Sequence, residues 1–492
     1  MLSKNTTVQS KVVITTLEAL MPQEHFLRDL NNLVDFSFIY KKVAHLYSDV
    51  GRPSVDPVVL VKSLLLGFIY GIDSERKIEK EIQVNIAYRW FLGIDLDEHV
   101  PDHSTISQTR RRKFNNTNLF EDIFAEVVKK CMEIGLVEGS LILTDSTHVK
   151  ANASSKRKEF VTIEIEPSEY VKKLDKLCDE EELKIRTDKI ERGLKKRGFK
   201  ADTKLKTKTI AKSTTDPDSG SLSRAGKPEG FHYLSHQSTC GKSGIITDVH
   251  VTPANVRDHT PYVERIKHQK EKLELDIKEV GIDKGYDCSE VHSEMLDMGI
   301  KTYTPLKDDE NKKGRIVFPP SAFVYNPHND TFTCPNGETL RFVSVDKRTH
   351  CKRYSLSRKL CVNCSLKTQC FSGNEHRRRL NIPLMQHKAD IQRANYGTMR
   401  YYEVQRLRRI YAEGNFALQK DNHNLRKTRK RGIQNVTNHC ILSALALNLK
   451  RLVKYIKNNP PLLTQIHKAF QKITTALKNR IRNSKLQILF SF

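Results

Sequence analysis

Short runs of β-branched and apolar residues, separated by helical patterns, recur between residues 139 and 305 of this chain. In order, they predict a strand at 139–151, a hairpin at 231–251, a helix near 258–274, a strand at 277–283, a helix from about Ser289 and a short strand at 301–305. Strands joined first by a hairpin and then through helices form a mixed sheet with one antiparallel edge. The chain is therefore expected to contain an α/β fold.

The regions around this pattern suggest several further units. We expect an N-terminal helical domain at 1–120, a core that begins at 121–305 and returns at 386–457, a charged helical insertion at 155–213, a Cys-rich insertion at 306–385 and a basic tail at 458–492. The 155–213 insertion has almost no strand character and is expected to lie over the core. The sequence does not place the tail.

The N-terminal region ends in a short basic helix. Ser104 is a candidate cap for this helix, which carries the consecutive residues Arg110, Arg111 and Arg112. Short helices that end in a basic one are typical of a helix-turn-helix-like contact with DNA. An ordinary helical bundle with a solvated basic face explains the same pattern equally well.

The net charge of the chain limits the classes of binding partner to be expected. The chain has 84 lysine and arginine residues against 58 aspartate and glutamate residues, a net charge of +26. This excess favours a polyanion, above all DNA or RNA, whereas a ribosome-associated protein or an acidic membrane surface is the alternative.

The distribution of apolar segments and the number of cysteines predict the cellular compartment of the protein. No apolar run approaches the ~20 residues of a membrane span, and the first residues lack the apolar segment of a secretory signal. We therefore expect no membrane partner and a cytoplasmic location. In that reducing compartment the ten cysteines are expected to be thiols or metal ligands.

Three acidic residues stand out as candidates for catalysis. Asp145 and Asp283 each end a β-branched apolar run, while Glu413 lies in a helical pattern. Carboxylates gathered from distant sequence can hold two divalent metal ions ~3.5–4 Å apart for two-metal-ion phosphoryl transfer. Taken singly, each acid is more often a turn or helix cap, and Asp287 is interpreted in that way, as the N-cap of the next helix.

The helix around Glu413 also carries cations at helical spacing. At 100° per residue, Arg409, Glu413 and Lys420 fall within about 40° of one another, so that the two cations are candidates to hold phosphate beside a metal-bound carboxylate. An exposed stripe of ion pairs is the alternative. The basic run after this helix is expected to lie next to the site and contact the DNA backbone: Arg426, Lys427, Arg429, Lys430 and Arg431.

Half of the cysteines cluster within the Cys-rich insertion. Cys361 and Cys364 form a CxxC pair, and Cys334 and Cys370 complete a set close to structural zinc spacing. Cys351 is a fifth candidate, which leaves the ligand set ambiguous. Reduced cysteines without metal are the alternative.

Several segments together resemble a known family. They are GRPSVDPVVLVKSLLLGFIYG, VPDHSTISQTRRR, LILTDSTHVKANAS, TDPDSG, IITDVHVTPANVRDH, GIDKGYD, CPNGE, CVNCSLKTQC and the Glu413 helix. Over roughly residues 20–455 the chain resembles the DDE transposases of bacterial insertion sequences, in the family named after insertion sequence eleven-eighty-two, within the group related to insertion sequence four.

This resemblance implies a ribonuclease-H-like core in which Asp145, Asp283 and Glu413 bind Mg²⁺ or Mn²⁺. The group's Tyr-x2-Arg-x3-Glu-x6-Lys signature matches at Arg409, Glu413 and Lys420, but position 406 is Arg where the signature has Tyr. His148 and Asp258 lie in family-like motifs and are candidates for supporting positions near the acids.

The implied activity is DNA transposition. The enzyme would cut double-stranded DNA at its element's terminal inverted repeats and join the freed 3′-hydroxyl ends to target DNA, acting as a homodimer that associates with the nucleoid. A zinc-containing DNA-binding regulator without catalysis and a metal-dependent nuclease without strand transfer are the alternatives.

Overall fold

A computed structural model gives the arrangement of most of the chain. It describes residues 12, 14–48, 50, 51, 54–115, 117–165, 169–191, 206–223, 226, 229–307, 318–370, 376–459 and 461. The 458–492 tail predicted from the sequence lies almost entirely outside this part of the chain.

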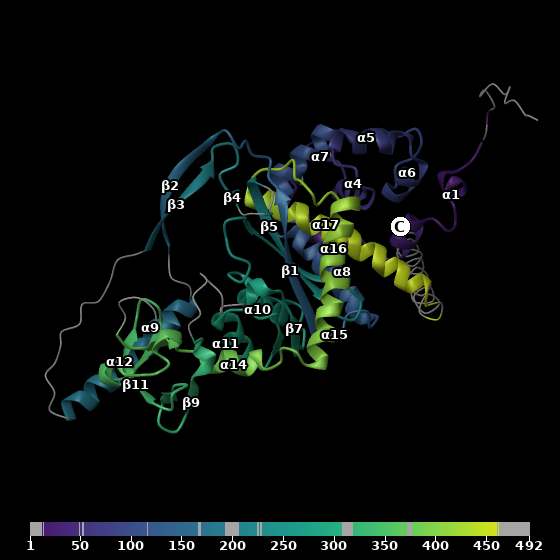
Figure 1. Ribbon diagram of the computed structural model, residues 1–492. Coiled ribbons are helices and arrows are strands. Elements are labelled where there is room, and N and C mark those ends of the chain that lie inside the picture. Colours follow the sequence, from purple (N-terminus) through teal and green to yellow (C-terminus); the bar gives the residue numbers. More distant parts are fainter. Residues whose placement is uncertain are drawn as a thin grey trace, which may run out of the picture.

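The central element is a mixed six-stranded sheet (Figure 1). Its strands are β1 (Leu141–Lys150), β4 (Gly220–Leu222), β5 (Gly230–Cys240), β6 (Ile246–Pro253), β7 (Glu279–Gly281) and β8 (Lys301–Tyr303). β4 and β6 both pair with β5, and the order continues through β1 and β7 to β8. β5 is antiparallel to its neighbours, whereas β1, β7 and β8 are parallel. The predicted mixed α/β sheet is confirmed.

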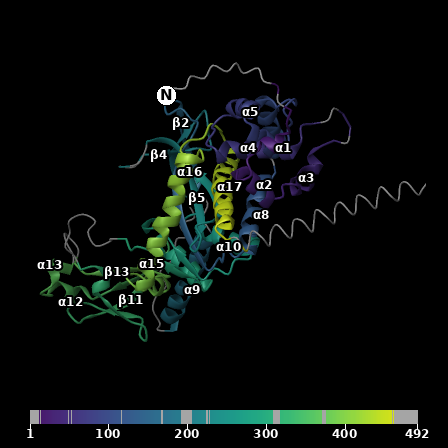
Figure 2. The ribbon, with the colours of Figure 1, turned by 90° about the vertical axis from the view of Figure 1, so that its right-hand side faces the viewer.

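Helices cover both faces of this sheet (Figure 2). On one side are α8 (Leu119–Glu133), α10 (Tyr262–Lys272), α11 (Ser289–Asp297) and α17 (Ile433–Lys457). On the other side a long helical segment crosses β1, made of α15 (Met399–Arg408), a π-helical turn (Arg409–Glu413) and α16 (Gly414–Asn422). Leu141 and Leu143 of β1 pack under α15 with Val404, whereas Ile142 enters the main core on the opposite face.

The N-terminal part of the described chain is helical. It contains α1 (Leu17–Leu20), α2 (Phe26–Leu33), α3 (Phe38–Val43), α4 (Pro57–Ile69), α5 (Glu75–Val84), α6 (Ile86–Leu92) and α7 (His103–Thr109), followed by a π-helical turn at Arg110–Phe114. Asp56 caps α4 by accepting from Val58 N at 2.6 Å, with Pro57 at the first helical position. Asp102, rather than the expected Ser104, caps α7 by accepting from Ser104 N at 2.7 Å.

A second sheet lies in the Cys-rich segment. Its antiparallel strands are β9 (Val324–Asn326), β10 (Thr331–Thr333), β11 (Thr339–Asp346), β12 (Cys351–Ser355) and β13 (Arg379–Pro383), accompanied by α12 (Arg358–Val362), α13 (Lys367–Cys370) and, after the sheet, α14 (Gln386–Arg393). Phe332, Leu340 and Tyr354 form a small core separate from that of the main sheet.

The 155–213 segment differs from the prediction in two ways. It contains a two-stranded ribbon, β2 (Lys158–Ile165) and β3 (Lys206–Ser213), in addition to the expected helix α9 (Glu169–Glu191). The helix lies mainly beside the second sheet (Figure 1), and only its start reaches the core, where Lys173 lies 2.9 Å from Glu294 of α11. Four contacts hold it there: Asp175 with His350 at 2.7 Å, Asp179 and Glu182 with Lys347, the latter at 3.3 Å, and Glu181 with Lys352 at 3.4 Å.

Candidate active site

Asp145 and Asp283 come together through the register of two parallel strands. β1 pairs with β7 so that Leu141 lies opposite Glu279 and Leu143 opposite Gly281. The same register, continued two residues further, brings Asp145 level with Asp283. Asp145 lies in the middle of β1 rather than at its end as expected, because the strand continues to Lys150. Asp283 follows β7 and accepts from Gly285 N at 2.8 Å.

The third acid reaches this point from the helical segment above the sheet. Gly281 of β7 lets this helical segment pack close to the sheet, since a Cβ atom at Gly281 would lie 2.5 Å from Val404 Cγ1 of α15. Glu413 ends the π-helical turn, and its side chain is 48% exposed, whereas that of Asp145 is 14% exposed. The site therefore has a buried floor and an open side.

Arg408 donates hydrogen bonds to two of the three acids. Its Nη1 donates to Asp145 Oδ2 at 2.9 Å and its Nη2 donates to Glu413 Oε1 at 2.8 Å. Gln405 holds the guanidinium by accepting from Arg408 Nε at 3.1 Å, and its own amide donates to Tyr303 O at 2.8 Å. A cation thus stands between two of the three carboxylates.

The sequence pattern predicted the neighbouring residue, Arg409, in this place. In a π-helical turn the backbone hydrogen bonds reach five residues along the chain rather than four, so the side chain five residues before Glu413 also lies beside it. Arg408 occupies that position, while Arg409 is exposed. Lys420 lies on α16 and lines a cavity beside the N-terminal helices. The structure thus pairs Glu413 with Arg408, and the phosphate contacts predicted for Arg409 and Lys420 stay a prediction.

The raised pKa values of Asp145 and Asp283 indicate that the site has too little positive charge to balance its carboxylates. Burial raises the pKa of Asp145 to about 6; Arg408 opposes this rise, whereas Asp283 and Glu413 add to it. Burial and the Asp258 carboxylate raise the pKa of Asp283. Nearby, Tyr286 has a buried hydroxyl without a hydrogen-bond partner among the described residues. Buried carboxylates that repel one another are a fitting ligand set for a divalent cation.

The spacing of the acids is wider than that of a loaded metal site. Within the described part of the chain, the three carboxylates are not a group whose ligand oxygens all lie within 4.8 Å of one another. The Arg408 guanidinium fills part of the space between them. Binding of one metal ion by all three residues would therefore require them to move closer together.

Asp258 also belongs to this neighbourhood. It accepts from Ser146 Oγ at 2.9 Å, and a Cβ atom at Gly285 would lie 3.3 Å from its Oδ2 and 2.9 Å from Asp283 Oδ1. His148 instead places its ring 6.2 Å from that of His232, centroid to centroid.

Asp287 is not the helix cap that the sequence predicted, because Cys288 has that position in α11. The Asp287 carboxylate is buried and accepts from Arg393 Nε at 3.0 Å, and its Oδ1 lies 3.0 Å from His292 Nε2. Although burial acts in the opposite direction, these hydrogen bonds hold the pKa of Asp287 well below its usual range.

The basic residues proposed for DNA contact differ in their availability. Arg110 is not a surface residue: its side chain is 7% exposed, lies 3.5 Å from Glu75 and donates to Asn435 at 3.2 Å. Arg111 and Arg112 are exposed. In the run after α16, Arg426, Lys427, Arg429 and Arg431 are exposed and Lys430 is half-buried. This run lies against the end of β1, where Lys150 N donates to Arg426 O at 3.1 Å.

Four cysteines meet in the second sheet's core. Cys334, Cys361, Cys364 and Cys370 all line one cavity of about 30 Å³. No three of their sulfur atoms lie within 4.8 Å of one another in the described chain. Cys351 is elsewhere, and its thiol donates to Thr349 O at 3.2 Å.

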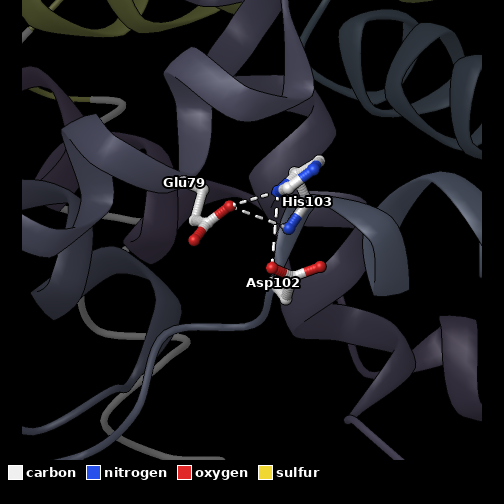
Figure 3. Close-up of side chains that lie close together, drawn as sticks. All are labelled: Glu79, Asp102 and His103. Carbon is white, nitrogen blue, oxygen red and sulfur yellow. Dashed lines mark hydrogen bonds and ion pairs between the residues drawn. The ribbon is translucent and has the colours of Figure 1, made fainter.

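A separate cluster in the N-terminal helices does bring three potential metal ligands close together (Figure 3). His103 Nδ1 lies 2.7 Å from Glu79 and 3.4 Å from Asp102. Arg76 Nε donates to His103 Nε2 at 3.2 Å, so Nδ1 carries the proton and has no lone pair for a metal. The His103 backbone N–H also donates to Glu79, at 3.0 Å. These contacts fasten the start of α7 to α5.

Comparisons with known families agree with the site's chemistry. Residues 15–112 match a family described as "Transposase domain (DUF772)", and residues 333–453 match one described as "Transposase DDE domain". The second match includes Glu413 but neither Asp145 nor Asp283. Together the matches support a DDE transposase, a class that uses divalent metal. They do not test the narrower insertion-sequence family suggested by the sequence.

Comparisons with whole proteins add little. No curated protein matches the chain. A solved structure titled "Crystal structure of the Mos1 mariner paired end complex with Mn" aligns at 7% identity and a TM-score of 0.15, covering 52% of this chain and 61% of that one. A piggyBac transposase synaptic complex with hairpin DNA aligns at 8% identity and a TM-score of 0.24, covering 91% and 85%. Scores this low support no argument about the fold.

Within the described residues, no helix combines the length and apolar character needed to cross a membrane.

Proposed function

We propose that this protein is a DNA transposase whose main sheet is a ribonuclease-H-like core. The observation that carries the proposal is the approach of Asp145 and Asp283 on adjacent parallel strands, beneath a helical segment that presents Glu413. The family matches support the class. The insertion-sequence family named in the sequence analysis, action at terminal inverted repeats and association with the nucleoid are parts of the same proposal.

Asp145, Asp283 and Glu413 would hold Mg²⁺ or Mn²⁺. The bound metal would lower the pKa of the attacking water or 3′-hydroxyl and neutralise charge on the leaving oxygen. Asp145 and Asp283 supply ligands from the rigid sheet, while exposed Glu413 approaches from the open side. No protein nucleophile is required, because water would attack in strand cleavage and the freed 3′-hydroxyl would attack in strand transfer.

Arg408 has two roles in this proposal. Without metal it screens the repulsion between Asp145 and Glu413 by bonding to both. With metal bound at the acids, the Arg408 guanidinium would be available to the DNA phosphate, which it suits as a planar, two-pronged donor. Gln405 positions Arg408 for both tasks.

DNA would approach along the exposed basic residues around the site. The Arg426–Arg431 run begins beside the end of β1 and continues from the helix that carries Glu413. Each phosphate that it neutralises adds about −0.9 to the slope of log affinity against log salt. Cutting two element ends in one complex favours a homodimer.

A nicking assay tests the function. Purified protein is expected to nick a duplex that carries its element's ends only with Mg²⁺ or Mn²⁺, and Asp145→Asn is expected to abolish nicking while retaining DNA binding. Normal cleavage by Asp145→Asn would refute the assignment. Binding without cleavage in either metal would favour the regulator, and cleavage without joining would favour the nuclease.

We further propose that Cys334, Cys361, Cys364 and Cys370 bind a structural zinc ion. Their shared cavity supports this set over one containing Cys351. Cys334 also begins a tight turn in which Gly337 N donates back to Cys334 O at 2.8 Å. Tetrahedral zinc with 2.3 Å bonds needs sulfur atoms about 3.8 Å apart, so metal would draw the four inward.

A further inference from the structure

We infer that a cavity between the N-terminal helices and the C-terminal half binds one nucleotide of a single DNA strand, with the base inside and the phosphates at the rim. This rests on the proposed function, since DNA is taken as the substrate. The cavity has a volume of about 340 Å³ and is walled by α4, α5 and residues 420–442. Sites for small ligands begin at roughly this size.

The inner wall of the cavity suits a base. It is apolar where Leu64, Ile78 and Leu442 line it, and it includes one aromatic ring, Phe68. Phe68 is half-buried, and its ring meets that of His439 edge to face at 5.0 Å. Burial lowers the pKa of His439 to about 4, so its ring is neutral at physiological pH. Stacking on an aromatic face is how proteins hold unpaired bases.

The rim suits phosphate. Seven cationic side chains line the cavity, against two acidic ones. Asp73 pairs with Lys77 at 3.3 Å and Arg429 at 2.7 Å, and Glu75 is shared by Lys430 and Arg110. Cations therefore remain in excess, among them exposed Lys427. The Arg110 Nε atom lies 3.5 Å from Glu75 Oε1, an oxygen that Lys430 also contacts, so one carboxylate serves two cations. A phosphate group would supply the missing negative charge.

The polar groups inside the cavity are already occupied. Asn424 Nδ2 donates to Gly67 O at 3.1 Å and to Ile72 O at 3.2 Å. Asn435 Oδ1 accepts from Arg110, and its Nδ2 donates to Arg431 O at 2.8 Å. With these amides engaged, little remains to read the edge of a base. We expect the cavity to accept any base by stacking.

The cavity's position fits the path of a substrate strand. Lys420 lines it, and this residue follows Glu413 by seven positions in the same helical segment, about 10 Å along the axis. At ~3.4 Å per nucleotide, a strand held at the acids would reach the cavity after about three nucleotides.

Binding of single strands by the full chain tests the inference, with divalent metal omitted. The probes are a labelled dT12 oligomer and an abasic oligomer with the same backbone, measured by fluorescence anisotropy. Phe68→Leu is expected to weaken dT12 binding about five- to tenfold and to leave the abasic oligomer within twofold. Lys427→Ala is expected to weaken both and to reduce the salt slope by about 0.7. Tyr325→Leu and Lys130→Ala, remote from the cavity, should change neither by more than twofold.

Equal effects of Phe68→Leu on the two oligomers, or no effect on either, would overturn the inference. The inference would also be overturned if the wild-type protein bound the two oligomers equally well and inorganic phosphate displaced both. That result would indicate an anion site only. Crosslinking of iodouracil-substituted dT12 to the wild-type chain needs no variant. Adducts within 64–78 or 420–442 support the cavity, and adducts confined to other segments refute it. Metal-dependent nicking is scored separately, so either proposal can fail alone.

Discussion

The two candidate metal sites of this chain are built in opposite ways. The acids are separated by more than a hundred residues and meet only because β1 and β7 pair in one register and a helical segment crosses them. The four cysteines lie within 37 residues, in a small sheet with its own core. The acidic site therefore depends on the global fold, whereas the cysteine site is a local module. The first should survive loss of its metal, and the second should not.

The largest expected effect concerns the cysteine module. Cys364→Ser is expected to lose zinc and unfold residues 318–383, because a structural zinc ion supplies roughly 10 kcal/mol or more of local folding free energy. Hydrogen exchange should show lost protection in β10–β13 but not in β1 or β5. Cys351→Ser is the matched control and should keep both zinc and protection. Equal behaviour of the two variants would argue against this ligand set.

The next effect separates two neighbouring arginines. Arg408→Ala is expected to lower the rate of nicking about 100-fold, since a charge aimed at the reacting phosphate is worth roughly that much. Arg409→Ala should lower it less than threefold, because the Arg409 side chain is exposed and Arg408 makes the hydrogen bonds to Asp145 and Glu413. Single-turnover kinetics at saturating DNA measure both. The reverse order would mean that the helical segment is a regular α-helix in the working enzyme.

The smallest effect tests repulsion at the acids. Asp283→Asn is expected to raise the melting temperature of metal-free protein by a few degrees, because Asn keeps the acceptor for Gly285 N and removes a charge beside Asp258. The sign follows from the raised pKa of Asp283, which means that its ionised form is disfavoured in the folded state. Calorimetry with and without EDTA would measure the shift. A lower melting temperature would show that no repulsion is stored there.

These contrasts explain what the sequence could reveal. Asp145 and Asp283 were recognisable because each adjoins an apolar run, and the cysteines because their spacing is local. Arg408 was not, since a π-helical turn depends on packing against the sheet rather than on residue spacing. Spacing alone also could not separate Arg110, which faces inward, from its exposed neighbours Arg111 and Arg112.

The missed ribbon has a different cause. β2 and β3 pair with each other alone, and Phe160 remains 70% exposed, so burial imposes no alternating apolar pattern on either strand. These residues therefore carry no periodic pattern from which the two strands could have been predicted.

The central claim is that Asp145, Asp283 and Glu413 converge on one divalent-metal site. Iron-mediated backbone cleavage tests it most directly, with Fe²⁺ and ascorbate added to the full chain bound to DNA. We predict cuts near residues 145, 283 and 413 that excess Mg²⁺ suppresses and Asp145→Asn removes. Cuts near 145 and 283 with none near 413, or cuts that Asp145→Asn leaves unchanged, would contradict the claim.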